Sequence, residues 1–179
     1  MKLNLGCGHD VREGWVNADV SPCDSRVLYC NLDEPFPRGW RWACEEIVLQ
    51  DVLEHLDDPE GCLENCAACL QPAGVLKVRG PHYTCRDTFT DLTHRRGLSS
   101  ETMSRWANRN GMTATVRLGF EPWNLWMSWV NLHPTLMKLY EATLLCGLAP
   151  AKYVHAELRW PMKTLQKIPP YQDAVSYAR

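Results

Sequence analysis

A glycine turn near the N-terminus is the first feature of the sequence that could do chemistry. An apolar run from Lys2 to Leu5 is typical of a short strand, and Gly6-Cys7-Gly8 follows it directly. Glycines at the end of a strand let the backbone approach a ligand closely and point free N–H groups at it. The next strand-like run ends near Asp19, whose carboxylate could accept hydrogen bonds from both hydroxyls of a ribose. Together these features predict a nucleoside-binding site.

The glycine turn also has two other interpretations. Pairs of glycines mark ordinary β-turns in many folds, so the turn alone is weak evidence. A site for a nicotinamide dinucleotide would prefer a third glycine or alanine three residues after Gly8, and Val11 stands there. The position of the turn before an acid at the end of the next strand therefore favours a nucleoside ligand other than a dinucleotide.

Three residues are candidates for a general base beside this turn. Asp51, His55 and His82 fall near the expected carboxyl ends of the fourth and fifth strands, where open α/β sheets bind ligands. Each has a structural alternative, because Asp51 and His55 can fix the start of the next helical segment and His82 can be a loop residue. The choice among them stays open.

A group of cysteines has the spacing of an iron–sulfur site. Cys62, Cys66 and Cys69 match the C-x3-C-x2-C pattern of radical enzymes. They also fall at i, i+4 and i+7 of an expected helix, which is the spacing of a buried stripe, and cysteine is among the most buried residue types. We favour the buried stripe and expect no metal site in the chain.

The elements that must position these residues alternate between strand and helix, which predicts an open α/β sheet. Strands are expected at Lys2 to Leu5, Trp15 to Val20, Val27 to Cys30, Glu46 to Gln50, Val75 to Arg79, Thr113 to Leu118 and Tyr153 to Trp160. Helices are expected from Pro59 to a stop at Gln71-Pro72-Ala73-Gly74, from Ser99 or Ser100 to Asn110, and from Pro134 to Cys146. The first two strands are too close in sequence for a normal parallel crossover, so the first helix should be shrunken or replaced by a loop.

Four motifs, taken in order, resemble those of small class I S-adenosylmethionine-dependent methyltransferases. They are Leu3-Asn4-Leu5-Gly6-Cys7-Gly8, Trp15-Val16-Asn17-Ala18-Asp19, Asp51-Val52-Leu53-Glu54-His55-Leu56 and Leu70-Gln71-Pro72-Ala73-Gly74-Val75-Leu76, and the likeness extends through Asp91-Leu92-Thr93-His94-Arg95. The resemblance implies a Rossmann-like, open, twisted and mostly parallel sheet of about seven strands with an antiparallel last strand. It implies a single domain over 1–179, with a cofactor-binding core (1–118), an aromatic and helical insertion (119–152), a closing strand (153–168) and a tail (169–179).

The resemblance implies S-adenosylmethionine as the cofactor and assigns residues to its parts. The backbone of Gly6, Cys7 and Gly8 would pass the methionine end, and Asn4 stands behind it where many members have an acid. Asp19 would hold the ribose, and Leu32 with Asp33 would flank the adenine. Gln50 and Asp51 would face the side that carries the methyl group.

The acceptor side of the site is expected on loops and in the insertion. His94 and Arg95 would form a substrate rim, with a solvated loop as the alternative. Trp123 and Trp126 could stack on a planar acceptor or a sugar ring, although with Trp129 they recur every three residues, like a helical face that packs. The expected activity is methyl transfer to a small-molecule or saccharide-like acceptor. A non-catalytic cofactor-binding sensor or partner domain is the alternative.

The composition narrows the protein class. The 179 residues, 45% of them apolar, suffice for one substantial core. Lys and Arg number 19 against 21 Asp and Glu, so no broad positive field favours nucleic-acid methylation. The sequence shows no apolar run of membrane-spanning length and no room for a secretory signal before the glycine turn. Nine scattered cysteines are typical of reduced thiols, so we expect a cytoplasmic protein.

Overall fold

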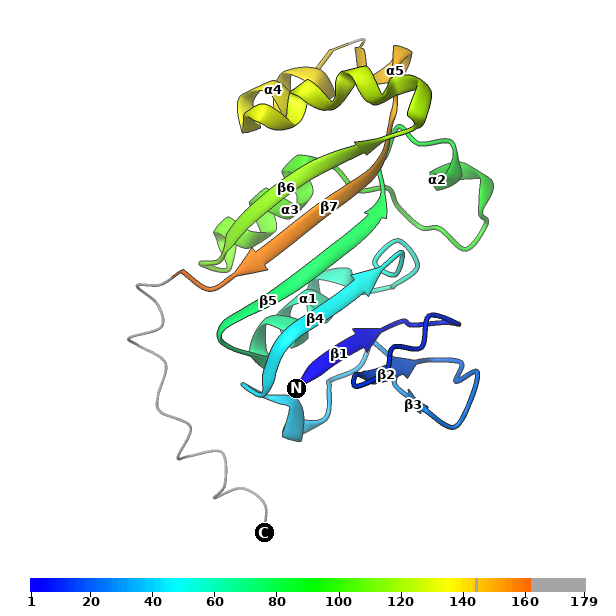
Figure 1. Cartoon of the computed structure of the whole chain (residues 1–179), viewed down its shortest axis with the longest axis vertical. Coiled ribbons are helices and arrows are strands. Elements are labelled where there is room, and N and C mark those ends of the chain that lie inside the picture. Colours follow the sequence, from blue (N-terminus) through cyan, green and yellow to red (C-terminus); the bar gives the residue numbers. More distant parts are fainter. Residues whose placement is uncertain (144, 162–179) are drawn as a thin grey trace.

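A single seven-stranded sheet organises the computed structural model of the chain, which describes residues 1–143 and 145–161 (Figure 1). The strands are β1 (Lys2–Leu5), β2 (Val16–Asp19), β3 (Val27–Tyr29), β4 (Cys44–Gln50), β5 (Leu70–Pro81), β6 (Thr113–Phe120) and β7 (Ala151–Arg159). Their order across the sheet is β3-β2-β1-β4-β5-β7-β6. The last strand, β7, runs antiparallel to both β5 and β6, whereas β1 to β5 pair in parallel. The predicted Rossmann-like α/β fold is confirmed.

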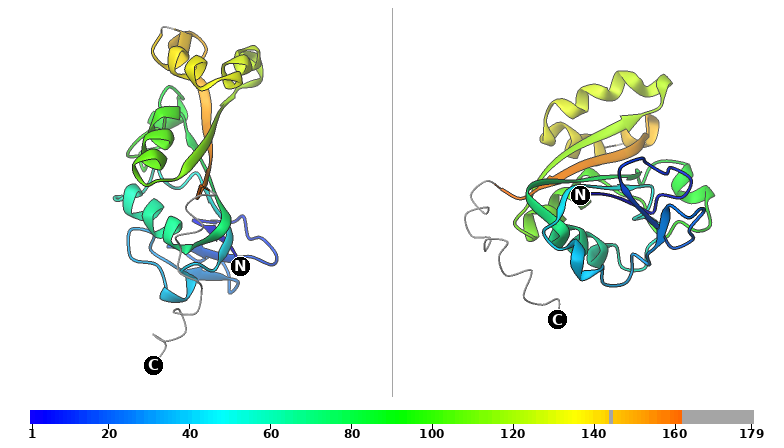
Figure 2. Two further views of the ribbon diagram at one scale, coloured as in Figure 1. Left: turned by 90° about the vertical axis from the view of Figure 1, so that its left-hand side faces the viewer. Right: turned by 60° about the horizontal axis from the view of Figure 1, so that its bottom comes forward.

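The two longest α-helices cover one face of this sheet. α1 (Pro59–Cys69) joins β4 to β5, α3 (Ser100–Arg109) joins β5 to β6, and both lie on the same side (Figure 2). The short η1 (Arg38–Trp40) and α2 (Asp87–Thr90) lie in connections. The predicted insertion between β6 and β7 contains η2 (Pro122–Leu132), α4 (Pro134–Glu141) and α5 (Leu145–Leu148). Within the part of the chain that the structure describes, no helix covers the opposite face of the sheet.

The strands alternate in character because only one face of the sheet is covered. In β5, Leu76 and Val78 are buried on the helical side, whereas Lys77 is exposed and Arg79 half-buried on the other side. Parallel strands are usually buried on both faces and are then apolar throughout. Side chains of a strand point alternately to its two faces, so a one-sided sheet requires this alternation. We call the uncovered side the open face.

The first crossover contributes to the open face, because it contains no helix. Residues 6–15 connect β1 to its parallel neighbour β2 as a loop, which confirms the shortened crossover. Two buried amides hold this loop: Asn4 Nδ2 donates to the Asp10 carbonyl (2.6 Å) and to Asn17 Oδ1 (3.1 Å). Asn17 Oδ1 also accepts from the Arg12 N–H (2.9 Å), and its Nδ2 donates to the carbonyls of Arg12 (2.9 Å) and Trp15 (3.3 Å). These hydrogen bonds hold the connection between β1 and β2 in place, a task that the packing of a helix against the sheet performs in a normal parallel crossover.

The helix starts follow the sequence signals. Asp58 Oδ1 accepts the Gly61 N–H at 2.9 Å and caps α1, with Pro59 in the first turn. Ser99 and Thr102 form a reciprocal capping box at the start of α3. Both helices therefore begin where the sequence predicts.

Two predicted boundaries are wrong. β5 begins at Leu70 rather than Val75, because Leu70 pairs with Cys44 and the register then shifts, so that the predicted stop at residues 71–74 becomes an irregularity within the strand. α4 ends at Glu141 rather than Cys146, and the Thr143 hydroxyl donates to a carbonyl of its last turn. Residues 162–168 of the predicted closing segment and the predicted tail, 169–179, lie outside the described residues.

The core lies between the sheet and its two covering helices. Cys62, Cys66 and Cys69 point into it from α1 and are each at most 2% exposed. Burial raises the pKa of the Cys66 thiol well above its ordinary value, which opposes the thiolate that cluster ligation needs. The spacing of these cysteines is therefore explained by packing. Within residues 1–143 and 145–161, no helix combines the length and the apolar composition required to cross a membrane.

The Asn pair can be tested through stability. We expect Asn17→Ala to lower the free energy of unfolding by about 2 to 3 kcal/mol, because buried groups of the loop lose their hydrogen-bond partners. Urea denaturation measures this change. Asn108→Ala, at an exposed position on α3, is the control and should change the free energy by no more than about 0.7 kcal/mol. A wild-type midpoint for Asn17→Ala would contradict the role of the pair.

Candidate functional site

The residues predicted to bind a cofactor lie at the carboxyl edge of the parallel strands. β1 lies between β2 and β4, so the strand order reverses direction between β1 and β4. Open α/β sheets bind ligands at such a switch point. The Gly6-Cys7-Gly8 turn follows β1, Asp19 ends β2, and Gln50 and Asp51 stand at the end of β4. The fold thus brings residues from three strands to one edge.

The glycine turn depends on backbone conformations that favour glycine. Gly6 has a φ of +63° and Gly8 a φ of +50°, both in the left-handed region. A Cβ at Gly6 would overlap with the side chain of Val52, whose segment follows β4. A Cβ at Gly8 would meet nothing within 4 Å, so this side of the turn is open. Gly6 therefore serves close packing, and Gly8 leaves space beside the backbone.

The Asp19 carboxylate is oriented by two backbone groups. Its Oδ2 accepts the Gly8 N–H at 2.8 Å, and its Oδ1 accepts the Ser21 N–H at 2.8 Å. The side chain is half-buried and lies beside the glycine turn. Each oxygen of a carboxylate can accept more than one hydrogen bond, so both can still receive a hydroxyl. This geometry suits a pair of neighbouring hydroxyl groups.

The two residues predicted to flank an adenine differ in their surroundings. Leu32 is 5% exposed and belongs to the core, whereas Asp33 is exposed. Asp33 Oδ1 accepts the Asp58 N–H at 2.8 Å and so connects the segment after β3 to the start of α1. Both residues follow β3 and thus lie at the same edge as the glycine turn.

Asp51 is paired with an arginine that the sequence analysis did not single out. Arg79 forms an ion pair with Asp51, with Nε donating to Oδ1 at 3.1 Å, and its guanidinium stacks on Tyr153 at 4.8 Å. The hydrogen bond to Asp51 raises the pKa of Arg79. Asp51 also has a φ of +55°, an uncommon conformation for a residue other than glycine and one that clusters at functional sites. The signal in the sequence was the alternation of β5, which places Arg79 opposite Gln50.

His82 lies in a buried network rather than in a cleft. Its ring is fully buried, with Nε2 3.0 Å from Glu141 Oε1 and Nδ1 2.7 Å from Thr84 Oγ1. Glu141 also accepts hydrogen bonds from the backbone and hydroxyl of Ser100, both at 2.7 Å. Burial raises the pKa of Glu141, but the hydrogen bonds from His82 and Ser100 outweigh it and lower the pKa below its ordinary value. The network connects the end of β5 to α3 and α4.

The structure brings His55 and His94 together. Their ring centroids are 4.7 Å apart, and His55 Nδ1 lies 3.0 Å from the Thr93 hydroxyl. The Arg95 side chain is exposed and pairs with an aspartate at the start of the α1 connection, Asp57. A predicted base and two predicted substrate residues thus share one cluster. Glu54 is completely buried beside them, and its only signal in the sequence was its place next to His55 in the motif.

The tryptophans of the insertion lie on η2. Side chains three residues apart eclipse each other in a 3₁₀ helix. Met127 and Val130 form the fully buried side, whereas Trp126 is 64% and Trp129 40% exposed. Their exposure argues against the packed alternative for these two residues and leaves the stacking role of Trp126 as a prediction. The side chain of Trp123 lies outside the described residues.

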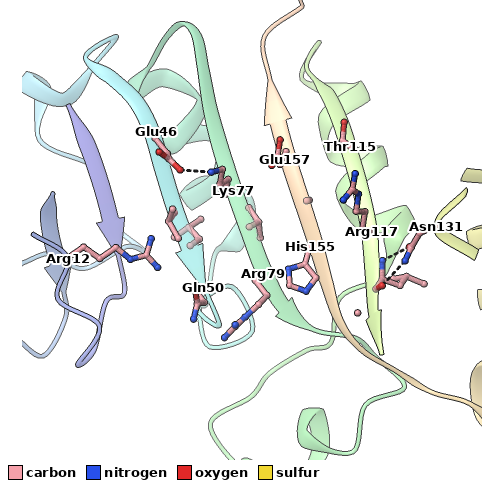
Figure 3. Close-up of a pocket in the computed structure, with 16 residues that line it drawn as sticks. Arg12, Glu46, Gln50, Lys77, Arg79, Thr115, Arg117, Asn131, His155 and Glu157 are labelled. Atoms are coloured by element: carbon pink, nitrogen blue, oxygen red, sulfur yellow. Dashed lines mark hydrogen bonds and ion pairs between the residues drawn. The ribbon is translucent and has the colours of Figure 1, made fainter. Parts of the chain in front are cut away.

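A groove of about 700 Å³ runs along the open face of the sheet (Figure 3). It is lined by side chains from four neighbouring strands, β4, β5, β7 and β6, with an arginine from the first crossover loop and an asparagine from η2. Its labelled residues are Arg12, Glu46, Gln50, Lys77, Arg79, Thr115, Arg117, Asn131, His155 and Glu157. Burial and the nearby Arg79 cation lower the pKa of His155. At Gln50 and Arg79 the groove reaches the carboxyl edge of the sheet.

The two glycines of the turn should respond differently to substitution. We expect Gly8→Ala to lower the free energy of unfolding by about 1 to 2 kcal/mol, because alanine disfavours the left-handed conformation. Gly6→Ala should lose about 1 to 3 kcal/mol more, because its Cβ also overlaps with Val52. Urea denaturation of the two variants makes the comparison. Equal losses would show that the turn does not pack on Val52 as described.

Comparison with solved structures finds this arrangement in other proteins. An S-adenosylmethionine-dependent methyltransferase from Archaeoglobus fulgidus is 12% identical, with 88% of this chain and 85% of that chain covered and a TM-score of 0.60. Phosphoethanolamine N-methyltransferase 2 of Haemonchus contortus, in complex with S-adenosyl-L-methionine, is also 12% identical, with 89% and 48% covered and a TM-score of 0.54. The [4+2]-cyclase SpnF is 15% identical, with 89% and 74% covered and a TM-score of 0.58.

These similarities concern the fold. No protein-family model and no curated protein sequence matches the chain. The structural similarity extends over 88% of this chain and 85% of the Archaeoglobus fulgidus structure. The protein has the fold of class I S-adenosylmethionine-dependent methyltransferases, with the first crossover helix replaced by a loop.

Proposed function

We propose that the protein binds S-adenosylmethionine at the carboxyl edge of β1, β2 and β4 and transfers its methyl group to a small-molecule or saccharide-like acceptor. The observation that carries this proposal is the Asp19 carboxylate, which two backbone N–H groups orient beside the glycine turn at the switch point. A similar fold in a solved methyltransferase complex with S-adenosyl-L-methionine supports the choice of ligand.

Each part of the edge has a role in this proposal. The backbone from Gly6 to Gly8 lies along the methionine end, and the Asp19 carboxylate accepts the ribose hydroxyls. Leu32 and Asp33 flank the adenine, and Gln50 with Asp51 faces the methyl-bearing side. Asn4 acts indirectly, because its amide holds the loop that carries the turn. Residues 1–118 then form the cofactor-binding core, and 119–152 contribute to the acceptor side.

Methyl transfer depends mainly on how the site positions the acceptor relative to the methyl group. The bound cofactor supplies a methyl group on a sulfonium, which an acceptor displaces in line, so alignment of the acceptor provides much of the acceleration. A base is needed only if the acceptor must lose a proton. Of the three candidates, Asp51 is paired with Arg79, and His82 is buried in its network with Glu141. Both side chains therefore have structural roles. His55 lies in the cluster with His94 and is the remaining candidate base.

The insertion supplies the acceptor surface in this proposal. β6 runs parallel to β5, so the insertion leaves β6 at the same edge as the glycine turn. There η2 presents Trp126 and Trp129, and the loop before α3 presents Arg95. Exposed indole rings offer an apolar face on which a sugar or a planar ring can stack. This combination of aromatic and cationic groups supports a saccharide-like acceptor.

A cofactor-binding domain without catalysis is the second candidate function. Its support is that Asp51 and His82, two of the three candidate bases, already have internal partners. SpnF, a cyclase by its name, also has a similar fold, so the fold alone does not define the reaction. Incubation with labelled S-adenosylmethionine and a panel of saccharides and small molecules distinguishes the two, because only the enzyme transfers label.

We expect Asp19→Ala to weaken S-adenosylmethionine binding by roughly 10- to 100-fold, because hydrogen bonds to a charged group contribute about 1.5 to 3 kcal/mol. Isothermal titration calorimetry measures the Kd. Glu64→Ala, at an exposed position on α1, is the control and should retain wild-type affinity. An unchanged Kd for Asp19→Ala would remove the central assignment of the cofactor site.

For an acceptor that the panel identifies, Trp126→Ala should raise KM by roughly 3- to 10-fold, which corresponds to about 0.5 to 1.5 kcal/mol of aromatic contact. The Kd for S-adenosylmethionine should not change. Leu132→Ala, 80% exposed on the same helix, is the matched control. A KM for Trp126→Ala that equals the control would place the acceptor elsewhere.

A further inference from the structure

A cluster of Glu54, His55 and His94 lies beside the carboxyl edge of β4. Each side chain offers one atom that can bind a metal, and these atoms all lie within 4.8 Å of one another. Among the described residues, neither carboxylate oxygen of Glu54 has a hydrogen-bond partner, and neither does the buried Nδ1 of His94. Glu54 is 0% exposed. Its carboxylate is therefore shielded from bulk solvent and accepts no hydrogen bond from the described residues.

This situation is unusual for a buried acid. Buried polar groups are almost always hydrogen-bonded, and a buried charge without a partner is costly. The same protein shows the ordinary solution at Glu141, which accepts hydrogen bonds from Ser100 and contacts His82. A cation bound between Glu54 and the two neighbouring histidines would supply the missing partner of this carboxylate.

The surrounding backbone holds the cluster together. The Arg95 N–H donates to the Glu54 carbonyl at 2.8 Å, and the Arg96 guanidinium donates to the Leu56 carbonyl at 2.7 Å. These bonds fasten the loop that carries His94 to the segment that carries Glu54 and His55. Gly80 lies beside the carboxylate, where a Cβ would overlap with Leu98 at 2.7 Å and lie 3.3 Å from Glu54 Oε2.

Asp91 sets the orientation of both histidines. The Thr93 hydroxyl donates to Asp91 Oδ1 at 2.6 Å, so its oxygen is left to accept from His55 Nδ1 at 3.0 Å. His55 Nε2 is then the unprotonated nitrogen. His94 Nε2 lies 3.8 Å from Asp91 Oδ2, which leaves Nδ1 of that ring as the ligand atom. Metal-binding histidines commonly use the other ring nitrogen in this way, toward a carboxylate or a hydroxyl.

We propose that Glu54, His55 and His94 bind a divalent first-row transition-metal ion. Two imidazole nitrogens and one carboxylate oxygen suit Zn²⁺ and its neighbours better than Mg²⁺ or Ca²⁺, which prefer oxygen ligands throughout. Ligand bonds of about 2.0 to 2.2 Å bring ligand atoms to roughly 3.3 Å from one another, so the cluster needs only a small contraction. Three protein ligands leave positions open for water or another oxygen donor. The site departs from the sequence expectation of no metal.

The test is metal binding by the whole protein after treatment with a chelator. We expect calorimetry to show one equivalent of Zn²⁺, with Glu54→Gln and His94→Asn each weakening binding by about tenfold or more, since even residues that only orient ligands have effects of this size. Zn²⁺ should raise the Tm of the wild type more than that of these variants. His133→Asn, at an exposed position that caps α4, is the control and should bind like the wild type.

Cobalt distinguishes this site from the nine cysteines. Titration with Co²⁺ should give the visible bands of nitrogen and oxygen ligation without a sulfur-to-cobalt charge-transfer band. A charge-transfer band, unchanged binding in both variants, or no binding by the folded wild type would each overturn the proposal. Calorimetry with S-adenosylhomocysteine on the chelator-treated protein reports separately on the cofactor site, so failure of one proposal is distinguishable from failure of the other.

Discussion

Two buried amides set the architecture of this protein. Asn4 and Asn17 face each other across β1 and β2, and their hydrogen bonds hold residues 6–15 as a compact loop. Because this loop needs no helix, one face of the sheet stays open and the glycine turn is held by polar contacts. The need for a hydrogen-bond donor in this loop explains why Asn4 stands where the methyltransferases that the sequence resembles often have an acid. A carboxylate at that position could not donate to the Asp10 carbonyl.

Local signals in the sequence predicted most of the fold. Short alternating runs, helix caps such as Asp58, and the glycine turn act over a few residues, and the structure confirms the elements that they predict. The start of β5 could not be predicted, because Leu70 extends the strand only by pairing with Cys44. The choice between stacking and packing for Trp126 could not be made from the sequence for a similar reason. A 3₁₀ helix and an α-helix present different faces, and the buried face depends on the contacts of Met127 and Val130.

The candidate site also has a part that the sequence could predict and a part that depends on tertiary contacts. The turn and Asp19 could be placed from their order along the chain, but their hydrogen bonds had to be seen in the structure. Glu54 and Glu141 show the difference most clearly, because both are buried acids, yet one is surrounded by donors and the other is not. Those donors come from residues far away in sequence, and burial itself is a property of the assembled fold. Sequence order therefore indicates which residues share an edge, and tertiary contacts decide what each can do.

The open face also determines how the strands can align. Lys77 and Arg79 alternate with Val78 along β5, and His155 and Glu157 alternate in the same way along the antiparallel neighbour. A slip of one residue in either strand would turn its charged side chains into the core and its apolar ones into solvent. A sheet with two covered faces and apolar strands has no such penalty. The alternation of charged and apolar side chains thus fixes the pairing register of these two strands. The open face in this way disfavours misaligned strand pairing during folding.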